Sequence, residues 1–254
     1  MLKPSPQYEH TCSEPLTWPL LIMPRDSANS IHPEDILKAY TLGYFPMARS
    51  HDEQNAMWVL PEERGVLLPE AARLPRKLRK SVARDPFHIT ANQAFEQVIE
   101  QCAARGEGPG ERVRADRMET WINDQILDVY TQLHRMGFAH SLECWENDVL
   151  VGGLYGLSLG GVFFGESMFS RRTDASKIAF AHLIGRLKIS GYCLIDTQFY
   201  TPHLAQFGVV EIEDSDYQIL LQDGLMQHAD YPVADNHSVS LSTSRVLQSI
   251  TQTS

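Results

Sequence analysis

The apolar residues of this chain follow two spacings, one of three or four residues and one of two. The segment SIHPEDILKAYTLGYFPM shows the first spacing, with Ile36, Leu37 and Tyr40 on one face of a helix. Pro33 suits a first helical turn, because the N–H that proline lacks would have no partner there. Gly43 can take the left-handed conformation that ends a helix. We therefore expect the ordered part of the chain to begin with this helix.

Three more segments have helical spacing, at 90–106, 123–137 and 174–191. The first opens with the spacing of a capping box between Thr90 and Gln93, and the other two end at a glycine. The apolar faces of the first and the last of these helices comprise Phe95, Val98, Ile99 and Cys102, and Phe180, Leu183, Ile184 and Leu187.

The spacing of two predicts strands. Residues 139–169 form three of them, separated by the turn sequences END and LGG. Short strands between turns are expected in 57–70, and one more strand in 192–199. The order helix, helix, three strands, helix, strand indicates an α+β fold with a mixed sheet flanked by helices.

Composition adds limits to this picture. The chain has 254 residues, 43% of them hydrophobic, and a net charge of −10. Its first 30 residues are rich in proline and polar residues, and residues 233–254 are rich in serine and threonine, so both ends read as poorly ordered tails. There is no apolar signal region and no apolar run near the ~20 residues of a membrane span. We expect a cytoplasmic protein.

Several residue types show no pattern of a disulfide, metal or phosphate-binding site. The four cysteines are far apart and favour neither a disulfide framework nor a zinc site. The histidines have no metal-ligand spacing with a third ligand, so we expect no metal. There is also no glycine-rich phosphate loop.

A basic run stands out against the acidic background. Its six cations, with no acidic residue among them, are Arg73, Arg76, Lys77, Arg79, Lys80 and Arg84. Such a run is often only a solvated helix face. In a chain of opposite net charge it also suits the docking of one polyanion through phosphate contacts.

The segment GESMFS, at 165–170, ends the third strand of the 139–169 run. It fails as a nucleophile elbow around Ser167, because the second glycine of that motif is missing. Glu166 follows two phenylalanines, so its carboxylate is expected either to be paired or to bind a cation. The alternatives are an ammonium group on a ligand with an apolar side chain and a salt bridge to Arg171, Arg172 or Lys177.

Two further features could carry chemistry. In LIDTQF, Asp196 and Gln198 lie two residues apart and so on the same side of a strand. A carboxylate beside a carboxamide can accept a proton from an amine and orient a carbonyl, although a hydrogen-bonded pair is the simpler interpretation. Trp121, near a helix start, either stacks on a base or packs in the core.

Taken together, the stretches LKAYTLGYFPM, LVGGLYG, GESMFSR…DASK and LIDTQ resemble the bacterial leucyl/phenylalanyl-tRNA–protein transferase family, over about 36–217. The resemblance implies a small N-terminal domain at 31–69 and a domain like the GNAT (acyl-CoA N-acyltransferase-like) enzymes at 70–232. It implies transfer of Leu or Phe, and less well Met, from aminoacyl-tRNA to N-terminal Lys or Arg of acceptor proteins, which marks them for degradation by the N-end rule pathway. It also implies no metal and no coenzyme A; we expect a monomer.

The resemblance also implies roles for single residues. Asp196 and Gln198 match the pair involved in amide formation, and Glu166 matches a carboxylate of the substrate pocket. Trp121 matches an aromatic residue near the terminal adenosine, and the basic run matches the region that contacts the tRNA acceptor arm. The residues that match the donor side-chain pocket are Leu154, Phe163, Leu183, Leu187 and Ile195.

The chain also departs from the family pattern. Met47 stands where other members have an adenosine-stacking tryptophan, and Leu154 and Leu183 replace a methionine and a phenylalanine. We expect residues 106–117 to form a longer loop than usual, whose arginines add contacts to RNA. We therefore expect changes in adenosine packing and in donor preference.

Three other functions remain open on the sequence. A coenzyme A-dependent acetyltransferase would need the [RQ]xxGx[GA] motif, which we do not find. A non-catalytic tRNA-binding module would explain the basic run but not the residues at 166, 196 and 198. A sister transferase would place Leu on N-terminal Asp or Glu, and the negative charge of this chain favours a basic acceptor instead.

Overall fold

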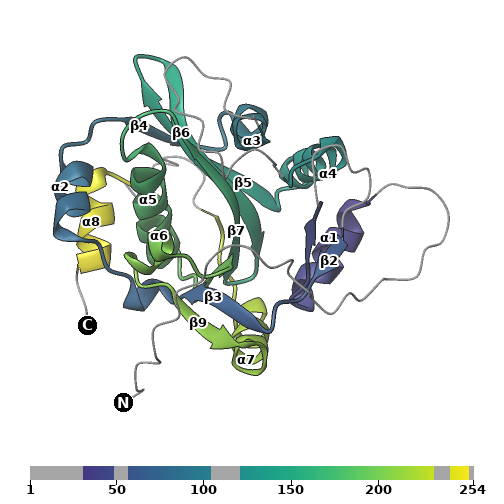
Figure 1. Ribbon diagram of the computed structural model, residues 1–254. Helices are drawn as coiled ribbons and strands as arrows, with labels where there is room; N and C mark the ends of the chain where they lie inside the picture. The colour runs from purple at the N-terminus through teal and green to yellow at the C-terminus, as the bar shows by residue number, and fades with distance from the viewer. Residues whose placement is uncertain (1–30, 49–56, 104–120, 232–240, 252–254) are drawn as a thin grey trace, which may run out of the picture.

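The computed structural model describes residues 31–48, 57–103, 121–231 and 241–251, and these contain one large mixed sheet. Its seven strands lie in the order β4-β5-β6-β7-β8-β3-β9. All neighbouring strands are antiparallel except β7 and β8, which are parallel and joined by helix α5 (Figure 1). The strand bounds are β3 Glu63–Leu67, β4 His88–Ala91, β5 Ala139–Glu146, β6 Val149–Leu159, β7 Val162–Ser170, β8 Leu194–Gln198 and β9 Val210–Glu213.

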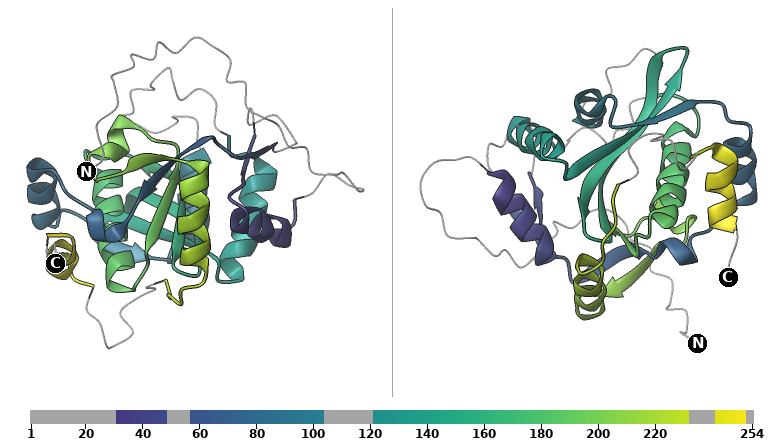
Figure 2. Two further views of the ribbon diagram at one scale, coloured as in Figure 1. Left: turned by 90° about the horizontal axis from the view of Figure 1, so that it is seen from below. Right: turned by 180° about the vertical axis from the view of Figure 1, so that it is seen from behind.

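Helices cover both faces of this sheet (Figures 1 and 2). One face carries α5, with α2 and α8 packed outside it, and an apolar cluster fills the space between. The other face carries α1, α3, α4 and α7 over a second apolar cluster. The helix bounds are α1 Pro33–Thr41, α2 Arg76–Ala83, α3 Phe95–Ala103, α4 Asp124–Arg135, α5 Ala175–Ile189, α7 Asp214–Leu225 and α8 Thr243–Thr251, with short helices η1 Pro69–Ala71 and α6 Pro202–Ala205.

The predicted α+β class, with a mixed sheet flanked by helices, is confirmed, and the arrangement is consistent with a GNAT-like fold. The three predicted strands are β5, β6 and β7. Asn147 and Asp148 form the tight turn between β5 and β6 with positive φ angles of 50° and 60°, a conformation that suits a two-residue hairpin. Gly43, Gly137 and Gly191 all take the left-handed conformation expected after a helix.

A small N-terminal unit precedes the large sheet. It consists of α1 and a two-stranded sheet of β1, Phe45–Met47, and β2, Met57–Val59. Strand β3, Glu63–Leu67, belongs to the large sheet, although it lies within the range 31–69 expected for the N-terminal domain.

Two expectations about local structure are wrong. Thr90 does not cap a helix: it lies in β4, its hydroxyl donates to the buried carboxylate of Glu143, and α3 begins only at Phe95. The expected tail at 233–254 contains helix α8, whose Val246 and Ile250 are buried against α5 and α2. The expected tail at 1–30 and the loop at 106–117 lie outside the described residues.

Helix α5 is also more enclosed than its sequence predicted. The expected apolar face is buried, but so are residues on the opposite side, because α2 and α8 cover it. No helix in the described part of the chain is long and apolar enough to cross a membrane.

Candidate functional site

The centre of the site is the point where β7 and β8 separate. The two parallel strands pair only from Val162 to Phe164 on β7. Beyond these residues, β7 and β8 are not paired with each other. Glu166 is the extra residue of a bulge on β7, and Gln198 at the end of β8 has a left-handed backbone with φ of 59°. A non-glycine residue in that conformation is uncommon and marks a locally strained position.

Side chains bridge this gap between the strands. The Gln198 Nε2 donates to Glu166 Oε1 over 3.1 Å, and the Tyr40 hydroxyl donates to the same oxygen over 2.6 Å. Because the Tyr40 hydroxyl has one proton, the Tyr130 hydroxyl, 2.6 Å away, donates to Tyr40 in turn. The result is a buried hydrogen-bonded chain from α4 through α1 to the bulge within β7.

Glu166 itself is held in an unusual state. Its second oxygen, Oε2, is buried and has no hydrogen-bond partner among the described residues. Burial raises the pKa of the Glu166 carboxyl to about 7, and the hydrogen bond from Tyr40 offsets part of that rise. None of the three cations considered as salt-bridge partners pairs with Glu166: Arg171 donates to Gln101, Arg172 pairs with Glu146 and Lys177 pairs with Asp174. Glu166 can therefore take up or release a proton near neutral pH.

Asp196 has a different environment. Its carboxylate is 0% exposed and forms an ion pair with Arg64, which is 1% exposed, at 2.7 Å. The Tyr217 hydroxyl donates to Oδ2 over 2.6 Å, and the backbone N–H of Gln198 donates to Oδ1 over 2.8 Å. The guanidinium also donates to the carbonyl of Gly43. Asp196 thus holds the backbone of Gln198 in place with every carboxylate oxygen occupied.

The two carboxylates therefore suit different tasks. Asp196 is positioned to orient Gln198, since its oxygens are taken by a cation, a phenol and an amide. Glu166 has a free oxygen and the raised pKa that proton exchange near pH 7 requires. Gln198 lies between them and presents a carboxamide where the strands diverge.

The five residues that match the donor side-chain pocket lie together, but on the other face of the sheet. They belong to the apolar cluster beneath α5, whereas the partners of Glu166 and Asp196 belong to the cluster beneath α1, α4 and α7. The ring of Phe163 lies over Gly156, where a β-carbon would come within 2.6 Å of two ring atoms. A glycine at 156 is thus required for this ring position.

The residues expected to contact tRNA are placed as follows. Met47 on β1 and Trp121 before α4 are both half-buried and pack on the cluster beneath α1 and α4. All six cations of the basic run are exposed on or beside α2, whose Leu78 and Val82 are buried inward. The basic run is therefore a helix face that is open to a partner.

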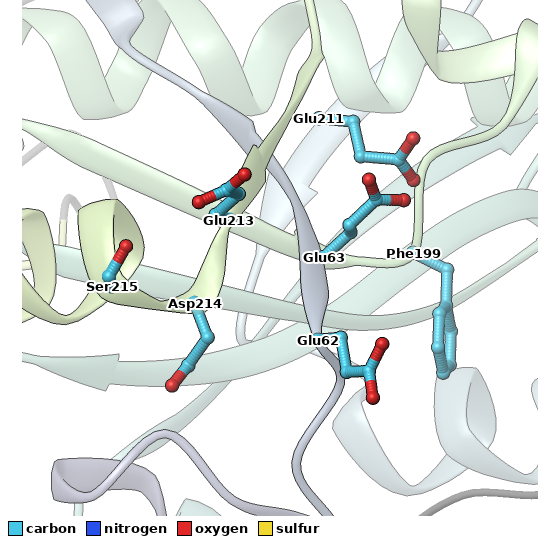
Figure 3. Close-up of a pocket in the computed structure, with 7 residues that line it drawn as sticks. All are labelled: Glu62, Glu63, Phe199, Glu211, Glu213, Asp214 and Ser215. Atoms are coloured by element: carbon cyan, nitrogen blue, oxygen red, sulfur yellow. The ribbon is translucent and has the colours of Figure 1, made fainter.

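An acidic pocket of about 640 Å³ lies beside the site (Figure 3). It is built from the ends of β3 and β9 and from Phe199, which directly follows Gln198. The carboxylates that line it are Glu62, Glu63, Glu211, Glu213 and Asp214. Figure 3 shows the side chains of Glu63 and Glu211 close to each other, with Phe199 at one side.

Four residues of the network had no signal in the sequence. Tyr40, Arg64, Tyr130 and Tyr217 come from four separate elements, and each read as an ordinary helix or strand residue. Tyr40, an apolar-face residue of the first helix, and Tyr130, in VYTQLHRMGFAHSLECW, fall within stretches that carry the resemblance, but neither was singled out as a site residue. Among the described residues, no group of His, Cys, Asp and Glu is arranged to hold a metal ion.

Two family models together match most of the chain. The family model for the leucyl/phenylalanyl-tRNA protein transferase matches residues 66–222, and that for the N-terminal domain of the same proteins matches 29–62. Three curated proteins named leucyl/phenylalanyl-tRNA–protein transferase are similar to the chain. The one from Hyphomonas neptunium is 48% identical over 78% of this chain and 74% of its own length, and that from Maricaulis maris 47% identical over 87% and 97%. The one from Paramagnetospirillum magneticum is 51% identical over 76% and 89%.

One solved structure gives a weaker match. The C-terminal DUF2156 domain of a protein from Agrobacterium fabrum has a TM-score of 0.37 at 13% identity, covering 77% of this chain and 57% of that one. A likeness at that level carries no argument about function.

Proposed function

Because the chain belongs to the leucyl/phenylalanyl-tRNA protein transferase family, and is thus an aminoacyltransferase, we propose that it moves Leu or Phe, and less well Met, from aminoacyl-tRNA to the N-terminal Lys or Arg of acceptor proteins. The modified proteins would then be recognised for degradation by the N-end rule pathway. We propose that it acts in the cytoplasm as a monomer.

The chemical step needs no added energy source. The neutral α-amine of the acceptor attacks the carbonyl carbon of the aminoacyl ester, a C–N bond forms and the bond to the ribose oxygen breaks. The amine loses one proton and the ribose oxygen gains one. Positioning the two reactants can supply roughly 7–11 kcal/mol of the barrier reduction, and a base that takes the amine proton on the order of 10²–10⁴ in rate.

We assign the roles from the hydrogen bonds around the gap. Gln198 orients the reacting groups with its carboxamide, and Asp196 keeps Gln198 in position through the hydrogen bond to its N–H. Glu166 is the group that exchanges the proton, because it has a free oxygen and a pKa of about 7. The chain from Tyr130 through Tyr40 stabilises the Glu166 carboxylate once the proton has left.

The acidic pocket is the observation that supports an acceptor with a basic N-terminal residue. A lysine or arginine side chain beside Gln198 would meet five carboxylates in this pocket, and its positive charge would be favourable there. An N-terminal Asp or Glu would be repelled by the same groups. This supports a basic acceptor over the sister specificity.

The donor and its tRNA would use the remaining features. The apolar residues beneath α5 would hold the donor side chain, and such a pocket discriminates by only ~1–3 kcal/mol per methylene, so overlap among Leu, Phe and Met is expected. Met47 and Trp121 would pack against the terminal adenosine. The exposed cations of α2 would contact the acceptor arm of the tRNA.

The test is a transfer assay with Leu-tRNA and peptides that begin with Arg or with Asp, read by mass spectrometry. We expect Leu on the Arg peptide alone. The double variant Glu211→Gln/Glu213→Gln should raise KM for the Arg peptide at unchanged KM for Leu-tRNA. The control is Glu96→Gln, which removes an exposed carboxylate that pairs with Arg135 and does not line the acidic pocket. Addition to the Asp peptide alone would establish the sister specificity, and bound tRNA without any transfer would establish a non-catalytic module.

A further inference from the structure

The apolar pocket beneath α5 is closed in the free protein. The residues assigned to it are between 0 and 3% exposed: Leu154, Phe163, Leu183, Leu187 and Ile195. A cavity large enough for a leucine or phenylalanine side chain would leave measurable exposed surface on the residues around it. A donor side chain can therefore enter only if a group of this protein moves out.

Tyr231 lies against this pocket. Its ring stacks on that of Phe163, with centroids 5.7 Å apart and planes at 23°, and on His140 at 4.1 Å and 12°. It is 7% exposed and belongs to the same apolar cluster as the five pocket residues. Because Gly156 lies against the ring of Phe163 as well, that ring is enclosed by backbone and by Tyr231.

The attachment of Tyr231 is weak compared with that of the other pocket residues, which are all on strands or on α5. It follows α7 through residues 226–230, which form no helix or strand, and most of these are exposed. Its hydroxyl donates to the carbonyl of Ser141 at 3.3 Å, a long hydrogen bond. The ring can leave without unfolding a helix or a strand.

We propose that Tyr231 fills the donor side-chain site of the free protein and that the side chain of the incoming aminoacyl-tRNA displaces it. This inference rests on the donor site of the proposed function. The tyrosine ring has the size and shape of a phenylalanine donor, and it contacts Phe163 as such a donor would. Between reactions it keeps the apolar site away from water.

A displaced group affects binding differently from a fixed wall. If the open form is a fraction of the free protein, the apparent dissociation constant is the intrinsic one divided by that fraction. This factor is the same for every donor that needs the site open. A fixed wall residue would instead change Leu and Phe binding by different factors, since it would alter the shape of the site.

The test measures binding of leucyl- and phenylalanyl-adenosine analogues in which an amide replaces the ester, by calorimetry. The proteins are wild type, Tyr231→Ala and Tyr231→Phe, with Phe87→Ala as control, because Phe87 is an aromatic residue of the same cluster with the same 7% exposure. Minor states are commonly populated at about 0.1–10%, so Tyr231→Ala should bind both analogues about ten- to a thousandfold more tightly, by one common factor.

Tyr231→Phe keeps the ring and removes the hydrogen bond to Ser141, so it should bind both analogues about twofold to tenfold more tightly than the wild type. It also preserves the packing, should the alanine variant fold poorly. Phe87→Ala should leave both affinities unchanged.

Three results would overturn the proposal. Unchanged affinities in both Tyr231 variants would show that the ring does not compete with the donor, and the proposed function would stand. A changed ratio of Leu to Phe binding would make Tyr231 a fixed wall, again with the function intact. Binding of neither analogue to any folded variant or to the wild type would remove the donor site itself, and with it the proposed function.

Discussion

Replacement of Glu166 by glutamine should change how the stability of the protein depends on pH. The pKa of Glu166 is about 7 in the folded protein, mainly because of burial, against 4.5 for an ordinary glutamate. Between these pH values the folded protein holds a proton that the unfolded chain has lost. The free energy of unfolding then falls as pH rises, by about 1.4 kcal/mol per pH unit. Over the whole interval the loss is about 3 kcal/mol, and glutamine, which does not titrate, avoids it.

The assay is urea unfolding at pH 5, 6, 7 and 8. Glu166→Gln already differs from the wild type in its free energy of unfolding at pH 5, because it alters the hydrogen bonds to Tyr40 and Gln198. This part of the difference is the same at every pH. From pH 5 to pH 8 the stability of the wild type should fall by about 2–3 kcal/mol relative to this variant. Glu96→Gln, which breaks an exposed ion pair with Arg135, should differ from the wild type by less than about 1 kcal/mol throughout.

A flat difference would refute the reasoning. If wild type and Glu166→Gln keep the same separation within about 0.5 kcal/mol from pH 5 to pH 8, no proton is taken up by Glu166 on folding in that range. The carboxylate would then be ionised at pH 7 in spite of its burial. Its assignment as the proton-exchanging group would have to be withdrawn.

Three other changes have definite expected results. Arg64→Met leaves Asp196 buried without its cation and should cost about 3–5 kcal/mol in urea unfolding, part of which Asp196→Asn should restore; a cost below about 1 kcal/mol would contradict a buried ion pair. Lys77→Gln with Lys80→Gln should weaken tRNA binding and lower its salt slope by about one per cation, and an unchanged slope would place the tRNA elsewhere. Gly156→Ala would push a β-carbon into the Phe163 ring and Phe164 carbonyl and should cost at least about 1–3 kcal/mol in thermal unfolding; wild-type stability would contradict the close packing there.

The elements that the sequence predicted well are those whose pattern is local. Helix α4 has an apolar stripe, a cap at Asn123 that accepts from the N–H of Ile126, and Gly137 after its end. The β5–β6 hairpin has alternating residues and a turn of Asn147 and Asp148. Each of these signals lies within about fifteen residues and does not depend on what packs against it.

The failures come from contacts that are distant in the sequence. Thr90 matches a capping box, but its hydroxyl donates a hydrogen bond to the carboxylate of Glu143, 53 residues away, and Thr90 stays in a strand. Helix α8 is short and lies in a segment rich in serine, so its own propensity is low. It is stabilised because Val246 and Ile250 find an apolar surface on α5, and Val246 packs against Gly185.

The candidate site shows the same division. Glu166, Asp196 and Gln198 could be singled out because they interrupt apolar strands, but their protonation and their roles depend on Arg64 and the tyrosines. Asp196 looked like an available base, and only the ion pair with Arg64, 132 residues earlier, shows that its oxygens are occupied. A carboxylate is visible in a sequence, whereas the partner that decides its charge is not.

The strained backbone at the gap explains why so many elements meet there. A left-handed residue such as Gln198 costs of order 1–3 kcal/mol, and the bulge at Glu166 gives up a ladder pair. These costs are offset by hydrogen bonds from other elements: Tyr40 of α1 to Glu166, and the N–H of Gln198 to an Asp196 that Arg64 of β3 holds. The parallel strands can therefore remain apart at this point only while α1 stays docked and β3 stays paired with β8, so loosening α1 should close or disorder the gap before the sheet unfolds.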